Sequence, residues 1–247
     1  MKIALISDIH ANREAFTAVL EHAQEYGATN HAFLGDFVGY GADPDWVVEK
    51  VREFTALGSI AVMGNHDAGV LRGPSAHMTP DARAGVEWTR EHLKPEHLEW
   101  LGHLPMSQIE GDRLYVHANA YAPEGFEYVQ GRLEAIRCLQ ATPCRFVFCG
   151  HMHAPMLYHM SLTGKAGHFE PTDATPVPLL PNRQWLAIPG STGQPRDGNP
   201  AACYAMFDTD QSELTFYRVP YDIQSAADRI RAAGLPSRLA ERLFEGT

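Results

Sequence analysis

Apolar runs alternate with amphipathic segments in the first part of the chain. Three short apolar runs predict strands, at residues 2–7, 31–34 and 59–63. Two segments with apolar positions at helical spacing lie between them, at residues 12–26 and 45–57. Each strand runs directly into a polar loop. We therefore expect an α/β arrangement whose loops gather at the carboxyl ends of the strands, where ligands usually bind.

The remainder of the chain mixes both patterns. Further helices are expected at residues 79–93, 95–101 and 132–140, and two C-terminal helices within 222–245, at 222–233 and 237–244. Further strands are expected at residues 113–117, 145–149, 185–188, 202–208 and 213–219, with a weak edge at 177–180. Residues 209–212 have hairpin character, so this half should add an antiparallel sheet to the same core. Residues 164–181 have the composition of a long irregular loop, either a surface excursion or a lid over residues 150–153.

Composition narrows the class of protein. The chain has 247 residues, 45% of them hydrophobic, which fits a single domain spanning residues 1–247. Its net charge of −10 argues against bulk binding of nucleic acid or of an anionic membrane. Cys138, Cys144, Cys149 and Cys203 show no C-x-x-C spacing and are expected as reduced core thiols. The apolar run near the N-terminus is too short for a signal peptide or a membrane span, so we expect a cytoplasmic protein.

Five polar clusters stand at the predicted strand ends. They are Asp8-Ile9-His10, Gly35-Asp36, Gly64-Asn65-His66-Asp67, Val116-His117 and Gly150-His151-Met152-His153. With 21 glycines and 13 histidines in the chain, a G-H-x-H match is expected by chance only about 0.06 times. The ordered set of clusters therefore indicates shared chemistry.

Alternation along a strand places residues i and i+2 on the same side. Asp8 with His10, and His151 with His153, are therefore expected to present ligand pairs. Carboxylate, imidazole and amide ligands without thiolate suit Mn, Fe, Co or Zn. Seven candidates exceed the need of one ion, which favours a pair of ions sharing one carboxylate. The candidates are Asp8, His10, Asp36, Asn65, His117, His151 and His153.

These motifs together resemble the calcineurin-like metallophosphoesterase superfamily. Its pattern D-x-H, G-D-x-x-G, G-N-H-[DE], H and G-H-x-H is met within residues 3–153. Residues 188–198 are similar to the segment that follows the last metal motif in the YfcE-like bacterial phosphodiesterase branch. The resemblance implies a four-layer αββα fold, with two facing mixed β-sheets flanked by helices and a metal site at one end.

The resemblance also implies a role for each motif residue. One divalent ion would be held by Asp8, His10 and His153, a second by Asn65, His117 and His151, and Asp36 would bridge them, with Mn favoured over Fe, Zn or Co. His66 would assist the leaving group, and Asp67 would orient His66 and favour its protonated form. The implied activity is hydrolysis of small phosphodiesters or phosphate esters by in-line attack of a metal-bound hydroxide.

Several alternatives stay open from the sequence. His117 taken alone fits a hydrogen-bonded core histidine, and Asp8 and Asp36 fit helix caps. Asn12 is either the cap of the first helix or a phosphate donor, and Tyr40 and Arg196 are either substrate contacts or packing residues. Competing activities are a dinucleoside-polyphosphate hydrolase and a protein phosphatase, and a competitor of another class is a non-catalytic protein-binding scaffold. The oligomeric state is left open.

Overall fold

The computed structural model describes residues 1–76 and 78–247, whose strands form two six-stranded sheets. The first sheet has the order β3 (Ile60–Ala61), β2 (Asn30–Phe33), β1 (Lys2–Ile6), β11 (Ala202–Asp208), β12 (Glu213–Val219) and β9 (Val177–Pro178). The second sheet has the order β4 (Ser107–Glu110), β5 (Arg113–Val116), β6 (Phe146–Phe148), β10 (Arg183–Ile188), β7 (Met156–Ser161) and β8 (Ala166–Phe169). Both sheets are mixed, as the resemblance implied.

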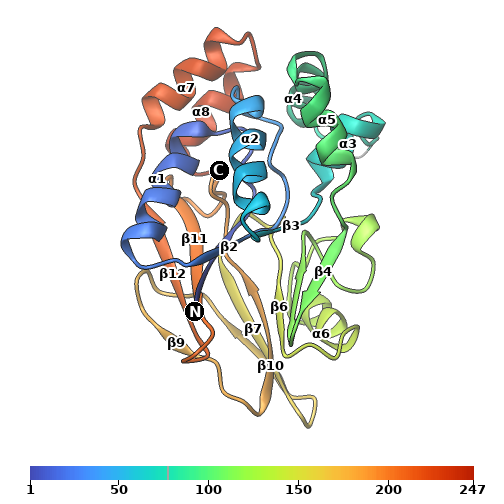
Figure 1. Ribbon diagram of the computed structural model, residues 1–247, viewed down its shortest axis with the longest axis vertical. Helices are drawn as coiled ribbons and strands as arrows, with labels where there is room; N and C mark the ends of the chain where they lie inside the picture. Colours follow the sequence, from blue (N-terminus) through green and yellow to red (C-terminus); the bar gives the residue numbers. More distant parts are fainter. Residues whose placement is uncertain (77) are drawn as a thin grey trace.

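Helices cover the outer faces of the two sheets (Figure 1). The helices are α1 (Arg13–Glu25), α2 (Pro44–Ala56), α3 (Asn65–Arg72), α4 (Pro80–His92), α5 (Pro95–Gly102), α6 (Arg132–Gln140), α7 (Ile223–Ala232) and α8 (Ser237–Glu245). α1 and α2 pack on the first sheet, and α7 and α8 lie beyond α1. α6 packs on the outer face of the second sheet. This is the four-layer αββα fold, and it places α3, α4 and α8 around one end of the sandwich.

The core lies between the sheets and on both of their outer faces. Ile3 and Leu5 of β1 point into the space between the sheets, where they join Phe146 and Phe148 of β6. Alternate residues of β1, such as Ile6, point outward against the helices. A strand buried on both faces needs apolar side chains at every position, which explains the continuous apolar run at the start of the chain.

The pairing of the strands confirms some expectations and corrects others. β1, β2 and β3 are parallel, and β11 and β12 form the expected hairpin. The expected antiparallel sheet of the second half is wrong in two respects. β11 and β12 extend the first sheet, and β5, β6 and β10 run parallel to one another. Strands β4, β7 and β8 were not expected, and β4 has no apolar pattern because it is largely exposed.

Residues 164–181 are not a long irregular loop. They contain β8, which pairs with β7, and β9, which pairs with the start of β12. Leu179 is buried between the sheets, and its carbonyl accepts a hydrogen bond of 2.6 Å from Arg145 Nη2. The segment therefore satisfies its backbone groups by adding strands to sheet edges. β9 lies toward the end of the first sheet where β1 begins, away from Asp8, so the lid interpretation is corrected.

Two further observations concern the cysteines and the helices. Cys138, Cys144, Cys149 and Cys203 are buried free thiols, as expected. In the described part of the chain, none of the helices combines the length and the apolar character needed to cross a bilayer.

Candidate metal centre

The candidate ligands meet because parallel strands end at the same edge of the sandwich. Asp8 follows β1, Asp36 follows β2, and Asn65 follows β3 in the first sheet. His117 follows β5 and His151 follows β6 in the second sheet. The two facing sheets therefore deliver their loops to one place, as is usual for ligand sites in α/β folds.

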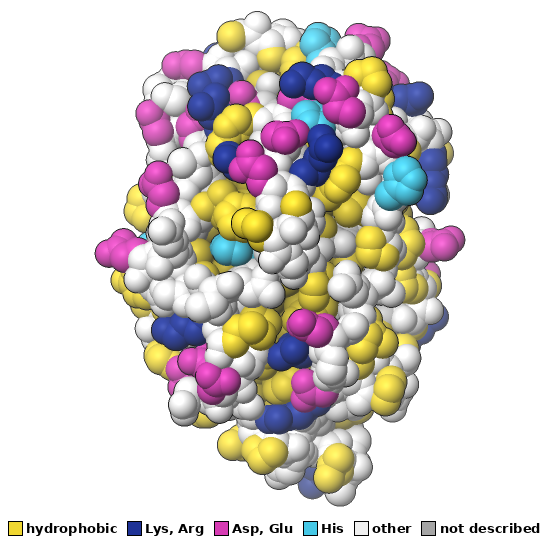
Figure 2. Space-filling view, viewed as in Figure 1, with side chains coloured by type: hydrophobic (Ala, Val, Ile, Leu, Met, Phe, Trp, Pro, Cys, Tyr) yellow, Lys and Arg dark blue, Asp and Glu magenta, His cyan; other side chains and the backbone are white. Residues whose placement is uncertain are grey.

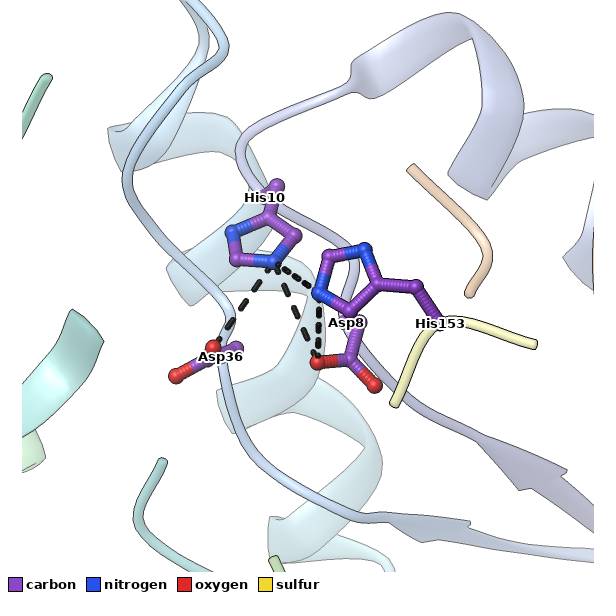
Figure 3. Close-up of side chains that lie close together, drawn as sticks. All are labelled: Asp8, His10, Asp36 and His153. Atoms are coloured by element: carbon purple, nitrogen blue, oxygen red, sulfur yellow. Dashed lines mark hydrogen bonds and ion pairs between the residues drawn. The ribbon is translucent and has the colours of Figure 1, made fainter. Parts of the chain in front are cut away.

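One group of potential ligand atoms comes from Asp8, His10, Asp36 and His153, all within 4.8 Å of one another (Figure 3). The Nε2 atoms of His10 and His153 are 3.2 Å apart. Asp8 Oδ1 lies 3.2 Å from His153 Nε2, and Asp36 Oδ2 lies 3.7 Å from His10 Nε2. All four side chains are buried.

A second group comes from Asp36, His117 and His151. His117 Nε2 lies 3.2 Å from His151 Nδ1, 3.0 Å from Asn65 Oδ1 and 3.5 Å from Asp36 Oδ2. Asp36 belongs to both groups, and its Oδ2 faces His10 on one side and His117 on the other. The two groups thus share one carboxylate, which is the position expected of a bridging ligand.

Left-handed backbone conformations, and not strand alternation, direct these side chains toward one another. β1 ends at Ile6, before Asp8 and His10, which have φ of 52° and 50°. His151 and His153, with φ of 68° and 60°, likewise follow the end of β6. Asp8 and His10 do share one group, whereas His151 and His153 fall in different groups, and these backbone conformations rather than strand alternation direct the side chains. Non-glycine residues rarely adopt positive φ, and their concentration here is typical of a functional site.

Backbone carbonyls fix the orientation of three histidine rings. Nδ1 of His10 donates to Val38 O at 3.1 Å, Nδ1 of His117 to Leu34 O at 2.7 Å, and Nδ1 of His153 to Gln194 O at 2.6 Å. Because a carbonyl oxygen only accepts, each Nδ1 carries the proton. Nε2 of a neutral ring then presents its lone pair to the cluster, as in metal-binding histidines whose second nitrogen is hydrogen-bonded.

The arrangement fits a cation between the ligand atoms. Nε2 of His10 and Nε2 of His153 face each other at 3.2 Å, although two lone pairs repel unless a cation lies between them. Asp8 Oδ2 accepts from Ser7 Oγ and from His151 N, whereas Asp8 Oδ1 is buried without a hydrogen-bond partner. A buried carboxylate oxygen without a partner is costly, and a divalent ion would satisfy it.

The charge states also suit metal ligands. Despite its burial, Asp8 has a pKa below its ordinary value because His153 lies beside it. Burial lowers the pKa of His10 and His153 and lowers that of His151 to about 3, so these rings are neutral at pH 7. His117 differs: burial opposes its charge, but the Asp36 carboxylate raises its pKa to about 9. The two groups of candidate ligands together therefore combine ionised carboxylates with mostly neutral imidazoles.

His66 lies beside the first group without belonging to it. Its ring is 4.8 Å from that of His10 and 4.5 Å from that of Tyr40, and its Nδ1 is buried without a hydrogen-bond partner. Gly39, with φ of 84°, packs so tightly against this ring that a side chain there would collide with it. The second glycine of the G-D-x-x-G motif thus leaves space for His66.

The expected role of Asp67 is corrected. Its carboxylate accepts hydrogen bonds from the backbone N–H groups of Asp36, Phe37, Val38 and Gly64, at 2.9 to 3.3 Å. It therefore does not orient the His66 ring. Burial and the charge of Asp36 raise the pKa of Asp67 to about 7, and burial lowers that of His66 to about 4. Asp67 instead ties the start of α3 to the loop that carries Asp36.

The three expected substrate contacts divide into two kinds. Asn12 is a structural cap, because its Oδ1 accepts from Ala15 N and its Nδ2 donates to Gly193 O. Its use as a phosphate donor is thereby corrected. Tyr40 and Arg196 do line the cavity next to His66, and Arg196 Nη2 donates to Tyr40 Oη at 3.2 Å.

This cavity has a volume of about 480 Å³ and opens beside the second group of ligands, because Asn65 and His151 line it. The lining residues that were not expected from the sequence include Arg72, Phe126, Tyr128 and Arg242. Arg72 lies seven residues after Asn65 on α3, a spacing that places both on one helix face and that could have identified it. No comparable spacing in the sequence identifies Arg242, because α8 reaches the cavity only through the packing of the C-terminal helices.

Residues 188–198 hold the loop that carries the first ligands. Ser191 Oγ donates to Asp8 O at 2.8 Å, and Gly193 N donates to the same carbonyl at 2.9 Å. Gln194 supplies the carbonyl that orients His153. The segment thus positions Asp8 and His153 and places Arg196 at the cavity wall.

Two facing mixed sheets between helical layers, with histidines and aspartates clustered at the strand ends, define a metallophosphoesterase fold. The chain belongs to the calcineurin-like phosphoesterase superfamily, whose domain description matches residues 1–212. This superfamily comprises metal-dependent phosphoesterases.

Relatives resemble the chain over its whole length. An uncharacterised protein of Methanocaldococcus jannaschii is 36% identical over 250 residues, covering 99% of this chain and 98% of the relative. The crystal structure of a metallophosphoesterase from Sphaerobacter thermophilus is similar with a TM-score of 0.88 and 37% identity, covering 100% of this chain and 99% of that one. A hypothetical protein from Pyrococcus horikoshii has the same fold, with a TM-score of 0.79, 21% identity, and coverage of 100% and 98%.

Proposed function

We propose that the protein is a two-metal phosphohydrolase that cleaves small phosphodiesters or phosphate esters. The observation that carries this proposal is the shared position of Asp36, whose Oδ2 faces His10 in one group of ligand atoms and His117 in the other. Two divalent ions bound there would hold phosphoryl oxygens, neutralise developing charge and lower the pKa of water.

The ligand set supports borderline or hard divalent ions. It offers carboxylates, imidazoles and the amide oxygen of Asn65, and it contains no thiolate. We favour Mn over Fe, Zn or Co for this set. Removal of the ions by a chelator should abolish hydrolysis, and Mn should restore it.

The protein's own groups have separable tasks in this proposal. His66 lies at the boundary between the cavity and the ligands, where it would assist the leaving oxygen. Tyr40 packs against the rings of both His10 and His66 and so fixes their relative position. Arg196, held by Tyr40 Oη, would contribute positive charge beside the substrate.

The cavity favours a small substrate with an aromatic or nucleoside group. Tyr128 stacks on His151 with ring centroids 4.0 Å apart, and it lines the cavity together with Phe126. These rings offer a surface on which an aryl group or a base would stack. Figure 2 shows acidic and basic side chains interspersed on one face, without a basic stripe that would follow a nucleic acid backbone. We therefore propose that long DNA and RNA are poor substrates.

A rate screen tests this proposal. The Mn-loaded protein should hydrolyse aryl and nucleotide phosphodiesters at least about tenfold faster, by kcat/KM, than it hydrolyses long nucleic acid. Phosphomonoesters and a phosphopeptide complete the panel, because a preference for the phosphopeptide would favour a protein phosphatase. Absence of hydrolysis of every ester by fully metal-loaded protein would contradict the proposal.

A further inference from the structure

The cavity beside the candidate metal centre has a charge opposite to that of the whole chain. Arg72, Arg196 and Arg242 line it, and Glu124 is the one acidic side chain among its described lining residues. The chain as a whole carries a net charge of −10. Within residues 1–76 and 78–247, none of the three arginines forms a salt bridge with an Asp or Glu side chain. The cavity therefore holds positive charge that is not paired with acidic side chains of the described residues.

Arg196 is held rigidly in the wall of the cavity. Its Nη2 donates to Tyr40 Oη at 3.2 Å and to Gln194 Oε1 at 3.1 Å, and its guanidinium lies 5.6 Å from the centre of the Tyr40 ring. Arg196 Nε is buried and has no hydrogen-bond partner. Gln194 also orients His153 through its carbonyl, so Arg196 is fixed relative to the metal ligands. A buried guanidinium nitrogen without a partner is a donor available to a ligand.

Arg242 and Arg72 extend the positive surface. Arg242 Nε donates to Thr247 O at 2.6 Å. Partial burial, followed by the charge of Arg196, lowers the pKa of Arg242, which indicates that the two guanidinium groups repel each other. Arg72 is exposed and lies two helical turns beyond Asn65, a rise of about 10 Å along α3. Arg72 thus extends the positive surface along α3, away from Asn65.

We propose that this cavity binds a second phosphate group of the substrate, with Arg196 and Arg242 as its contacts and Arg72 at the rim. The inference rests on the proposed function, because it assigns a substrate class to the same site. Guanidinium groups form paired, charge-assisted hydrogen bonds with phosphate, and an anion between two of them removes their repulsion.

The position of Arg72 indicates that this phosphate is not the one attacked. Arg196 adjoins the ligands, because its backbone N–H donates to His153 O at 3.2 Å, whereas Arg72 lies two helical turns beyond Asn65 on α3. A substrate with one phosphoester held at Asp36 would leave Arg242 and Arg72 without an anion. The second phosphate is either joined to the first by an anhydride bond or carried elsewhere on a nucleoside.

Three p-nitrophenyl esters test the proposal and distinguish these two sources. They are the esters of thymidine 5′-phosphate, of thymidine 5′-diphosphate and of thymidine 3′,5′-bisphosphate esterified at its 5′-phosphate. All three contain the same nucleoside and aryl group, and chromatography of the products identifies the bond cleaved. With Mn-loaded protein, kcat/KM for one of the two-phosphate esters should exceed that for the one-phosphate ester by about 10- to 100-fold.

Substitutions of single arginines then locate the second phosphate. Arg242→Gln should reduce the preference for the two-phosphate ester by about tenfold or more. Arg72→Gln, at an exposed position that tolerates substitution, should also reduce the preference for the two-phosphate ester, but by a smaller factor. Arg231→Gln is the matched control, because Arg231 on α7 is partly exposed, pairs with Asp228 and does not line the cavity. It removes the same charge and should leave the preference unchanged.

A binding measurement separates this proposal from the proposed function. In chelator-treated protein, calorimetry should detect thymidine 3′,5′-bisphosphate binding about tenfold more tightly than thymidine 5′-phosphate, and Arg242→Gln should abolish the difference. Failure to cleave any ester, with this difference intact, would contradict the hydrolytic function and leave the arginine site supported. Equal kcat/KM for the three esters, with equal binding of the two nucleotides, would overturn the second-phosphate site.

Discussion

Four residues at the candidate metal centre are each fixed through an atom that does not face the ligand cluster. His10, His117 and His153 bind carbonyls through Nδ1, and Asp8 uses Oδ2 to accept from Ser7 and His151. These bonds leave one atom of each side chain free toward the cluster. His66 differs from these residues, because its Nδ1 is buried without a hydrogen-bond partner.

Substitutions of two neighbouring histidines should have different effects. His66→Gln should retain both metal ions and reduce kcat by about 10²- to 10⁴-fold, because general acid–base assistance has that magnitude. His151→Ala should lose metal first, because it removes a ligand atom from the second group. Metal analysis alongside kinetics distinguishes the two. A metal-free but folded His66→Gln protein would place His66 among the ligands.

Asp67→Asn should destabilise the protein. The four backbone N–H groups that donate to the carboxylate would face an amide that accepts through only one atom. We expect a loss of about 2 kcal/mol or more in the free energy of unfolding, measured by urea denaturation at pH 8. His66→Gln is the control for this measurement. Unchanged stability combined with lost turnover would instead support the sequence prediction that Asp67 acts on His66.

Residue identity was more predictable than residue conformation. The spacing of the motifs identified Asp8, His10 and Asp36 together, since few structures other than a metal site require these types at successive strand ends. It could not show that Asp67 faces backbone N–H groups, because an acid beside a histidine is compatible with either partner. Arg242 was not predictable either, because its position depends on how a distant helix packs.

At the scale of elements, most buried strands were predictable, whereas the inner strand β7 and the exposed edge strands β4 and β8 were not. β1 is apolar on both faces, so its sequence identifies it. β4 and β8 lie at the two edges of the second sheet, where exposed positions accept polar residues. Most of residues 164–181 therefore resembled a loop, although the segment forms β8 and β9, and of these only β9 was expected, as a weak edge.

His31 in β2 should make the stability of the fold depend on pH. Its ring packs 4.4 Å from that of Phe54 in α2, and burial lowers its pKa to about 4 from an ordinary value of 6.5. Between these values the unfolded chain binds a proton that the folded chain does not. The contribution of His31 to stability is therefore lost as pH falls from about 6.5 to about 4, at up to about 1.4 kcal/mol per pH unit.

His31→Phe tests this contribution, because phenylalanine retains the packing against Phe54 and cannot be protonated. Urea denaturation of both proteins across this pH range should show a steeper dependence for the unsubstituted protein. Identical slopes would show that His31 is hydrated in the folded state.

At the scale of the whole molecule, the site exists only when the two sheets pack together. The first sheet supplies the strands that lead to Asp8, Asp36 and Asn65, and the second supplies those that lead to His117 and His151. Each group of ligand atoms draws on both sheets. The core between the sheets therefore sets the distances within the site, and metal binding should stabilise the folded chain.

The central claim is a pair of metal ions that share Asp36, and metal stoichiometry tests it most directly. Mn-reconstituted protein, freed of excess metal and analysed by mass spectrometry, should contain two ions per chain. Asp36→Ala should fall below that value, since both groups lose a ligand. A stoichiometry at or below one ion per chain in the intact, folded protein would contradict the account.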